Sequence, residues 1–342
     1  MDGDRTEHLE TADTELIQIC ASHAKEKYGE ILPDSISKRL KVETDNIVKN
    51  GYAAAYMTAR KFVKLSNDDG YVVGSRGCLG ASLVAYLLGI TEVDPIKFNI
   101  PYETLMGLDG NKAHDIELNV SDDYWDDNCC RLNITHDHRD SHGNSIHITI
   151  IKNNAPTMIN ALETLTGVIS KSIPIDDETT LKMLMNADTL FLPGLGDKLI
   201  REMIRTAKPE SFDDFVAILG LASGTGIWED NAECLIESGR ATISEVVAHR
   251  DDIMLSLMAQ GVDRERAYDI MESVRRGNGI SNEHMKLLSN CDLPEWYIDS
   301  CKKIAYLFPK AHSVAYMIVF FRIAWYKAHY PDVFRKIVES KL

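Results

Sequence analysis

Hydrophobic residues along this chain are spaced as in helices near both ends and as in strands between them. In residues 14 to about 65 they recur every three or four positions, and Pro33 separates two helical segments. Helical spacing returns after Pro156 and continues to the end of the chain, interrupted by short turns that contain Gly or Pro. In this second part, Ser211 is predicted to cap the start of a helix and Gly277 to end another.

The strand pattern is confined to the middle of the chain. Residues 71–73 are an apolar run, followed by a glycine-rich loop and a helix expected to begin near Ala81. Apolar and polar residues alternate in residues 115–120 (DIELNV), and residues 146–151 predict another strand. Strands followed by a long helical part predict an α+β fold, with a small mixed sheet and its helices preceding an all-helical domain.

Composition divides the chain into three parts. Residues 1–14 are acidic and poor in apolar residues, which predicts a loose tail. Residues 15–155 form the α/β domain, and residues 156–342 form the helical domain.

The loop after residues 71–73 is the most informative local feature. Glycines let a ligand approach the backbone closely, and the free N–H groups at a helix start attract anions. An arginine in the loop could add a two-pronged contact to a phosphate. The alternative is a plain connection between a strand and a helix. The predicted phosphate cradle consists of Gly74, Ser75, Arg76, Gly77 and Gly80.

Charge limits the classes of function. The 342 residues carry a net charge of −15, which argues against indiscriminate nucleic-acid binding. Residues 296–342 nevertheless hold eight Lys or Arg against three Asp or Glu, so a local basic groove is possible, with a solvated charged face as the alternative. The longest apolar stretch, residues 313–325, is interrupted by Arg322 and is too short to span a bilayer. We expect a cytoplasmic protein that does not bind membranes.

The cysteines do not predict disulfides. There are seven, without regular spacing. A zinc site is conceivable where cysteines and histidines cluster, but no C-x₂-C pair is present, so a polar surface hairpin is the preferred interpretation. The cluster contains Cys129, Cys130, His136, His138, His142 and His147.

Several long segments share the sequence pattern of one known family. They are KRLKVETDNIVKNGYAAAYMTARKFV (38–63), DDGYVVGSRGCLGASLVAYLLGITEVDP (68–95), IPYETLMGLDG (100–110), FLPGLGDKLIREMI (191–204), ISEVVAHRDDIM (243–254), IMESVRRGNG (270–279) and LPEWYIDSCKKIAYLFPKAHSVAYMIVFFRIAWYKAHYP (293–331). In this order they cover most of residues 35–335. The chain thus resembles the catalytic core of bacterial replicative DNA polymerase III alpha subunits of the PolC type.

The resemblance implies a nucleotidyltransferase-like palm followed by helical fingers. It implies DNA and deoxynucleoside triphosphates as ligands, and two Mg²⁺ ions held by three carboxylates. The phosphate role would belong to the glycine loop and Ser82. In the fingers, Lys310 and His312 would face phosphate, Tyr316 would contact the base pair, and Arg275 and Arg276 would be further cations. For Tyr316, the alternative is a place in the apolar core helix.

The chain departs from the family at the metal site. The family carries Asp-Ile-Asp where this chain has Asp115-Ile116-Glu117. The extra methylene of glutamate displaces the carboxylate by roughly 1 Å, a displacement that catalytic geometry tolerates poorly. The third carboxylate position is occupied by Thr149, whose neutral hydroxyl cannot replace that charge. Asp115 and Glu117 could still share one Mg²⁺; alternatively, they are solvated acids at the end of an edge strand.

Two family insertions are also missing. Only 26 residues separate Asn119 from Ile146, which leaves no room for the thumb that the family inserts there. Members of the family carry a zinc module between the positions of Pro95 and Pro101. This chain has no such insertion there, so we expect it to lack the zinc module.

These departures affect the metal-binding carboxylates and the thumb that binds duplex DNA, whereas the glycine loop is retained. The interpretation that follows is a PolC-related pseudoenzyme, inactive or weakly active, that still binds DNA or a nucleotide. The alternatives are an active primer-extending polymerase, a non-catalytic regulatory subunit that contacts replication proteins, and one part of a split polymerase completed by another chain.

Overall fold

The computed structural model describes residues 2–123, 138–139 and 145–340. The chain forms two compact units, unit 1 (Met1–Asn160) and unit 2 (Ala161–Leu342). Helix α7 (Asn154–Thr166) runs across the division. The boundary therefore lies five residues beyond residue 155, where the hydrophobic pattern changes.

Unit 1 contains more helix than its pattern predicted. Three helices, not two, precede the glycine loop, because Gly51 (φ 70°) interrupts the second predicted segment. The first helix already begins at Asp2, within the segment predicted to be a loose tail, since no proline interrupts the chain before Pro33. The helices are α1 (Asp2–Tyr28), α2 (Asp34–Lys49), α3 (Ala53–Asp68), α4 (Leu83–Leu87) and α5 (Glu103–Met106), with a 3₁₀ turn η1 (Leu79–Ala81).

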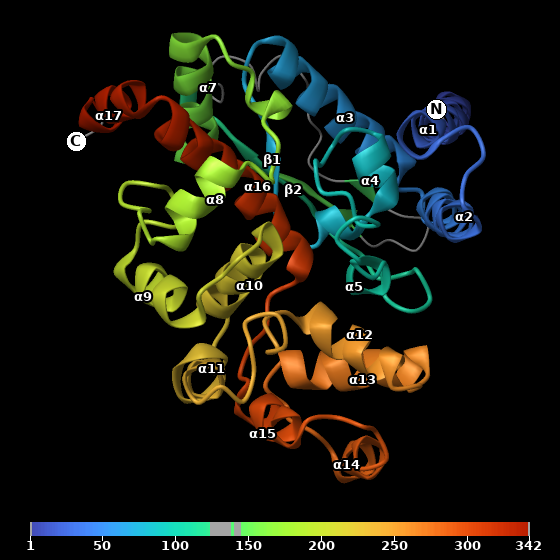
Figure 1. Ribbon diagram of the computed structural model, residues 1–342. Helices are drawn as coiled ribbons and strands as arrows, with labels where there is room; N and C mark the ends of the chain where they lie inside the picture. The colour runs from blue at the N-terminus through green and yellow to red at the C-terminus, as the bar shows by residue number, and fades with distance from the viewer. Residues whose placement is uncertain (1, 124–137, 140–144, 341–342) are drawn as a thin grey trace. The chain divides into compact units, whose positions relative to one another are not determined.

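A three-stranded mixed sheet lies in unit 1, as the sequence predicted (Figure 1). Its central strand β2 (Ile116–Val120) pairs antiparallel with β1 (Gly74–Ser75) and parallel with β5 (Ile148–Lys152). The first strand was predicted three residues too early. The Tyr71 N–H donates to the Ser66 carbonyl (2.8 Å) at the end of α3, so ladder pairing begins only at Gly74.

The last predicted strand, residues 146–151, is divided in the structure. Residues Ser145–Ile146 form β4, which pairs antiparallel with β3 (His138–Arg139), and β5 begins two residues later. The remainder of the predicted polar hairpin lies outside the described residues.

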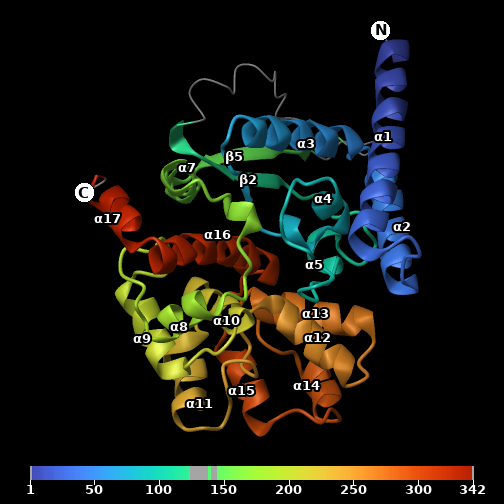
Figure 2. The ribbon, with the colours of Figure 1, turned by 45° about the horizontal axis from the view of Figure 1, so that its top comes forward.

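The helices of unit 1 build its core around α3 and α4. Helix α1 contacts both α3 and α4, and α2 contacts α4; Figure 2 shows α1, α2 and α4 next to one another. Ile116, Leu118 and Val120 of β2 are fully buried. The largest buried side chains contributed by the helices, by the N-cap of α3 and by η1 are Leu16, Ile47, Tyr52, Tyr56, Phe62, Leu79, Leu83 and Leu87.

Unit 2 is helical throughout its described length, as predicted (Figure 1). A π-helical turn, η4 (Trp228–Ala232), and a 3₁₀ turn, η3 (Ser170–Ser172), complete it. Its helices, after the end of α7, are α8 (Glu178–Met185), α9 (Lys198–Ala207), α10 (Phe212–Ser223), α11 (Glu233–Glu237), α12 (Arg250–Ala259), α13 (Arg264–Arg275), α14 (Asn282–Leu288), α15 (Glu295–Lys303), α16 (Lys310–His329) and α17 (Pro331–Glu339).

The 20-residue α16 contacts α8, α10 and α17 (Figure 2). Val314, Met317 and Phe321 are fully buried, which confirms the prediction of an apolar core helix. The predicted cap at Ser211 is confirmed as a capping box with Asp214. Gly277 (φ 73°) follows α13 and its C-cap residue, as expected for a helix stop.

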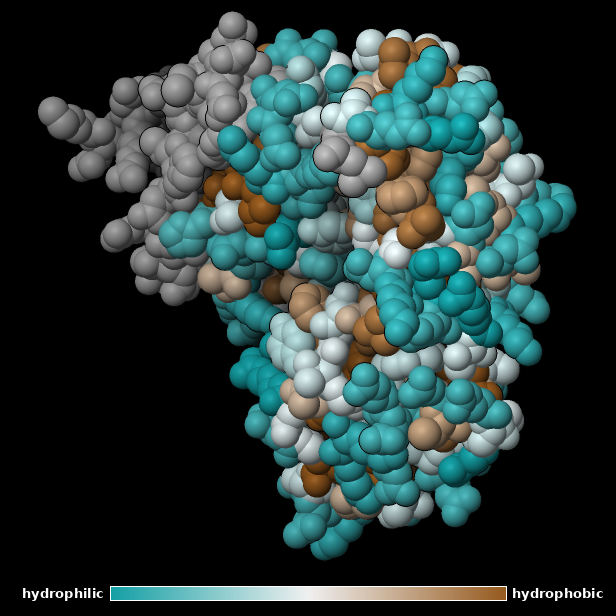
Figure 3. Space-filling model, turned by 90° about the vertical axis from the view of Figure 1, so that its left-hand side faces the viewer, coloured by the Kyte–Doolittle hydropathy of each residue, from teal (hydrophilic) through white to brown (hydrophobic). Residues whose placement is uncertain are grey.

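The exposed surface is mostly polar. On the face in Figure 3, hydrophobic residues form small separate patches among hydrophilic ones. Within the described residues, no helix combines the length and apolar character needed to cross a lipid bilayer.

Two glycines of unit 2 offer a matched test of core packing. A Cβ on Gly194 (φ 65°) would lie 2.1 Å from the buried Phe320 ring, whereas a Cβ on Gly239 (φ 69°) would meet nothing within 4 Å. Both Ala substitutions carry the left-handed backbone cost of about 1–2 kcal/mol, so Gly194→Ala should destabilise unit 2 by at least about 1 kcal/mol more. Urea unfolding of the two variants measures the difference. Equal losses would contradict this packing.

Candidate functional site

One face of the central strand carries the predicted carboxylates. Side chains alternate along a strand, so Asp115, Glu117 and Asn119 share a face opposite the buried apolar residues of β2. The parallel register places Thr149 of β5 directly beside Glu117. Asp115 is exposed, and its Oδ1 accepts the His147 N–H at 3.3 Å. Glu117 thus belongs to the central strand, and Asp115 directly precedes it; neither residue lies on an edge strand.

The glycine loop contacts this face. The Arg76 N–H donates to the Glu117 carbonyl at 3.2 Å, continuing the pairing of β1 with β2. The Oε2 atom of Glu117 lies 2.3 Å from the point that a Cβ on Gly77 would occupy, and Gly77 has φ 65°. A side chain at position 77 would push this carboxylate from its present place, so Glu117 and the loop lie against each other.

Several predicted phosphate ligands of the loop point their polar groups into the protein. The Ser75 hydroxyl is buried and bonded to the Thr91 hydroxyl at 2.6 Å. Gly80 is buried, and a Cβ there would lie 2.9 Å from Val93, so its role in the structure is close packing. The groups that remain accessible are the half-buried Gly74, Arg76 and Gly77.

Ser82 is the fully buried N-cap of α4. Its hydroxyl accepts the Ala85 N–H at 3.0 Å and donates to Glu43 Oε2 at 2.9 Å. Glu43 is also fully buried and accepts the Val84 N–H at 3.2 Å. The protein's own side chains therefore satisfy two of the free N–H groups at the start of α4.

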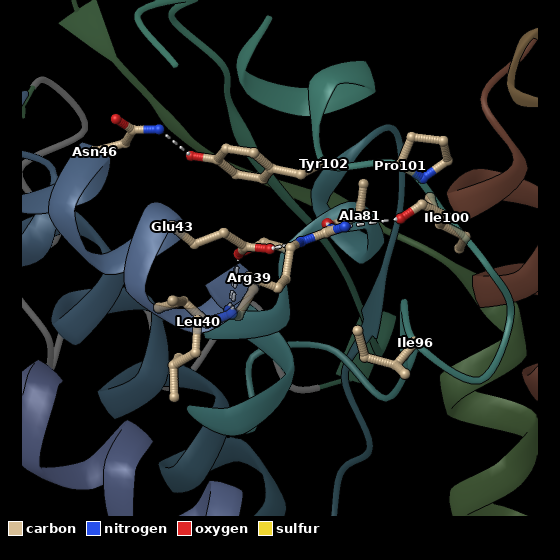
Figure 4. Close-up of polar contacts among 12 residues, drawn as sticks. Arg39, Leu40, Glu43, Asn46, Ala81, Ile96, Ile100, Pro101 and Tyr102 are labelled. Atoms are coloured by element: carbon tan, nitrogen blue, oxygen red, sulfur yellow. Dashed lines mark hydrogen bonds and ion pairs between the residues drawn. The ribbon is translucent and has the colours of Figure 1, made fainter. Parts of the chain in front are cut away.

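Arg39 compensates the buried charge of Glu43. The two residues lie one turn apart on α2, and the Arg39 Nε donates to Glu43 Oε1. Figure 4 shows the same guanidinium reaching the carbonyls of Ala81 (2.6 Å) and Ile100 (3.3 Å), with the Tyr102 ring 5.3 Å away. A buried carboxylate is tolerated when it is paired and hydrogen-bonded in this way.

The sequence analysis missed this network, which we call the Glu43 network and define as Arg39, Glu43, Ser82 and the N–H of Val84. The R-x-x-x-E spacing within α2 was the available signal, because residues four apart share a helix face. Asn119 was missed as well, although strand alternation places it on the face of Asp115 and Glu117. Its buried Oδ1 has no partner among the described residues.

His114 directly precedes Asp115, and buried contacts hold its ring in place. Its Nε2 lies 2.8 Å from the Tyr56 hydroxyl, and the Tyr52 ring packs edge-on at 5.6 Å. Burial lowers the pKa of His114 to about 4, so the ring is neutral at pH 7.

In unit 2, the predicted arginines share one carboxylate. Arg275 and Arg276 both donate to Glu272 Oε2 at 2.8 Å, and Arg250 Nη1 lies 3.9 Å from Glu272 Oε1. Arg275 is largely buried by this contact, whereas Arg276 is more than half exposed. A phosphate would therefore have to compete with Glu272 for both side chains.

The other predicted residues of unit 2 lie at the start of α16. The buried Asp251 accepts the Lys310 N–H at 2.8 Å, so a carboxylate again bonds the first turn of a helix. His312 packs against Tyr316, with ring centroids 4.8 Å apart, and both residues are half-buried. The Leu307 N–H donates to the Arg275 carbonyl at 3.1 Å, which links the end of α13 to the segment before α16.

The donors in unit 1 do not fit a paired-magnesium site. Mg²⁺ requires hard oxygen ligands, and two ions need more negative charge than Asp115 and Glu117 supply. Thr149 adds only a hydroxyl. In the part of the chain that the structure describes, no three His, Cys, Asp or Glu residues gather as a metal site. Of the residues considered for zinc, His147 is exposed, and Cys129, Cys130, His136 and His142 lie outside the described residues.

Comparison with known proteins identifies the family. Residues 14–189 match the model of the bacterial DNA polymerase III alpha NTPase domain, and residues 148–291 match the bacterial DNA polymerase III alpha subunit finger domain. The chain belongs to the bacterial DNA polymerase III alpha family, PolC type. The expectation from the sequence segments is confirmed, and unit 1 and unit 2 correspond to an α+β palm and helical fingers.

The relatives named DNA polymerase III PolC-type are much longer. The protein of Caldanaerobacter subterraneus is 31% identical over 472 positions, which cover 95% of this chain and 34% of the relative. The protein of Oceanobacillus iheyensis is 30% identical (97% and 34%), and that of Staphylococcus epidermidis 29% (95% and 33%). The chain spans about a third of these relatives. Because 472 aligned positions exceed the 342 residues, at least 130 positions of the first relative have no counterpart here.

Removing the charge of Glu43 should destabilise unit 1. Glu43→Gln leaves Arg39 without its carboxylate in a largely buried site, a change that costs about 3 kcal/mol. The control is Glu178→Gln, which removes an 84% exposed partner of Lys182 and should change stability by less than about 0.5 kcal/mol. Urea unfolding measures both variants. A loss no larger than that of the control would show that the Glu43 network does not stabilise the palm.

Protonation of His114 should destabilise the palm in mild acid. The folded pKa of about 4 lies below the ordinary value of 6.5, so the unfolded chain binds the proton more tightly. The free energy of unfolding should therefore fall by about 3 kcal/mol as the pH drops from about 6.5 to 4. His114→Gln should lack this component, and unfolding curves of both proteins across that range measure it. Parallel pH dependences would contradict the assignment.

Proposed function

We propose that this chain is a catalytically impaired relative of PolC-type polymerases that retains binding of DNA or of a deoxynucleoside triphosphate. The observation that carries the proposal is the register of the palm sheet, in which Thr149 stands beside Glu117. At this position the family resemblance implies the third metal-binding carboxylate.

The chemical argument concerns charge. Phosphoryl transfer depends on cations that neutralise the attacking and departing oxygens, and the protein must hold those cations with carboxylates. Asp115 and Glu117 provide two negative charges, and the Glu117 carboxylate lies against Gly77 of the loop. Binding of a single Mg²⁺ between these two acids is part of the proposal, and no catalytic step is assigned to it.

Retained binding is supported by the loop itself. Gly74, Arg76 and Gly77 are partly accessible beside the strand acids, and the Arg76 Nε has no hydrogen-bond partner among the described residues. A guanidinium with an unsatisfied donor is suited to a phosphate. The buried hydroxyls of Ser75 and Ser82 would then shape the loop without contacting the ligand.

A second candidate is a subunit of a split polymerase or a replication-associated interaction subunit. The unmatched positions of the longer relatives favour it, because another chain could supply the missing segments. This candidate predicts that a complementary polymerase chain co-purifies with the protein and restores primer extension. The first candidate predicts no extension after such a chain is added.

Two assays on the full chain test the proposal. In calorimetric titration with a deoxynucleoside triphosphate and Mg²⁺, Arg76→Ala should weaken binding about tenfold, the loss expected for one charged hydrogen bond. The control Arg266→Ala removes the same charge from a 65% exposed side chain and should leave the affinity unchanged. In a primer-extension gel, the unmodified chain alone should not extend a primer with Mg²⁺ or Mn²⁺.

Two outcomes would contradict the proposal. Extension by the unmodified chain that is abolished by Asp115→Ala would establish an active polymerase. Absence of triphosphate binding, together with absence of binding to duplex and single-stranded DNA, would exclude a retained binding function. A gain of extension in the variant carrying Glu117→Asp and Thr149→Asp would confirm that these two positions cause the impairment.

A further inference from the structure

A cavity of about 400 Å³ in unit 2 lies apart from the glycine loop and from the residues discussed at α13 and α16. It is formed by η4, α11, the turn that follows α11, and the helix α15. Arg240, Lys302 and Lys303 are among the residues that line it, and Trp296 and Asn231 belong to its wall. A volume of this size is within the range of small-ligand sites.

One of the three cations that line this cavity is paired with a carboxylate of the lining, Asp299. Lys302 Nζ lies 3.0 Å from Asp299 Oδ1. The pKa of the Asp299 carboxyl is lowered by this hydrogen bond and the charge of Lys302, and further by the charges of Lys303 and Arg240. Asp299 is the only acid among the described lining residues, so the lining carries two positive charges in excess.

The wall of the cavity is fixed by buried contacts. The Asn231 side chain is 3% exposed, and its Nδ2 donates to the carbonyls of Gly226 (2.9 Å) and Ser300 (3.3 Å). These bonds tie η4 to α15. The Arg240 N–H donates to the Leu235 carbonyl at 2.9 Å, and Lys303 Nζ donates to the Asp230 carbonyl. The backbones that carry the three cations are thus held in place before any ligand arrives, which reduces the entropic cost of binding.

We propose that this cavity binds a phosphate group, with Arg240, Lys302 and Lys303 as its donors. The phosphate belongs to a nucleic-acid strand or to a free nucleotide, and the two sources present the same anion to the site. The inference deepens the proposed function and rests on it, because it assigns part of the nucleic-acid binding to unit 2. It is separate from the glycine loop and from the residues at the start of α16.

In this arrangement Asp299 competes with the ligand. Without a ligand it pairs with Lys302; a phosphate must displace it to reach that ammonium group. The charge of Asp299 also repels an incoming anion. Loss of that charge should therefore strengthen binding, whereas loss of any of the three cations should weaken it. A surface that attracts anions only through its general charge would not distinguish these positions.

The test measures binding of a fluorescein-labelled single-stranded oligonucleotide to the full chain by anisotropy at several salt concentrations. Arg240→Ala and Lys302→Ala should each weaken binding about three- to tenfold, and each should reduce the salt slope by about 0.7. Asp299→Asn should tighten binding about two- to fivefold. The control Lys198→Ala removes a 90% exposed lysine of unit 2 and should change nothing. Circular dichroism melts of all variants verify that they are folded.

A second arm distinguishes the two sources of phosphate. If the cavity holds a nucleic-acid strand, the same variants should change the affinity for the oligonucleotide but not for a deoxynucleoside triphosphate. If it holds a free nucleotide, both affinities should change, and inorganic pyrophosphate should compete. Either pattern supports a phosphate site in the cavity.

Two results would overturn the inference. One is weaker or unchanged binding in Asp299→Asn; the other is an effect of Lys198→Ala as large as that of Lys302→Ala. Failure of the glycine-loop site would look different, because Arg76→Ala would then leave triphosphate binding unchanged while the cavity variants still altered oligonucleotide binding. Absence of all phosphate and oligonucleotide binding would remove both proposals.

Discussion

The buried carboxylate of Glu43 is the constraint on which the palm depends. A charge without solvent must be paired and hydrogen-bonded, and Arg39, Ser82 and the Val84 N–H meet that need. Through these bonds α2 holds the start of α4, and Arg39 holds the carbonyl of Ala81 at the end of the glycine loop. The loop can then pair with β2 and lie against Glu117. The network therefore determines where the loop lies and which of its groups remain accessible.

Internal carboxylates that satisfy a helix start or an arginine occur within the fingers as well. Asp251 accepts the Lys310 N–H at the start of α16, and Glu272 holds Arg275 and Arg276. In both units, internal carboxylates occupy positions where the family resemblance implies phosphate. These acids keep the helix ends and the arginines satisfied without a ligand. In the palm, the Arg76 Nε has no such partner among the described residues.

Much of the fold could be predicted because it follows from local patterns. Alternation in residues 115–120 gave the central strand, Ser211 with Asp214 gave a capping box, and the apolar run after Lys310 gave the buried α16. The first strand was misplaced because the Tyr71 N–H bonds to Ser66 at the end of α3, a contact that no periodicity encodes. The extra helix boundary at Gly51 and the early start of α1 were also missed, since weak local preferences do not fix where a helix begins or ends.

The sequence by itself determined the family and the α+β division. It also determined that the residue paired with Glu117 in the sheet, Thr149, is neutral, which holds in any conformation. Only the tertiary structure decided which polar groups are free to act. Ser82 meets Glu43 from 39 positions away, and Ser75 meets Thr91, so hydroxyls that look like phosphate ligands are buried. Hydrogen bonds between distant segments form only when the chain packs, and burial then makes them obligatory.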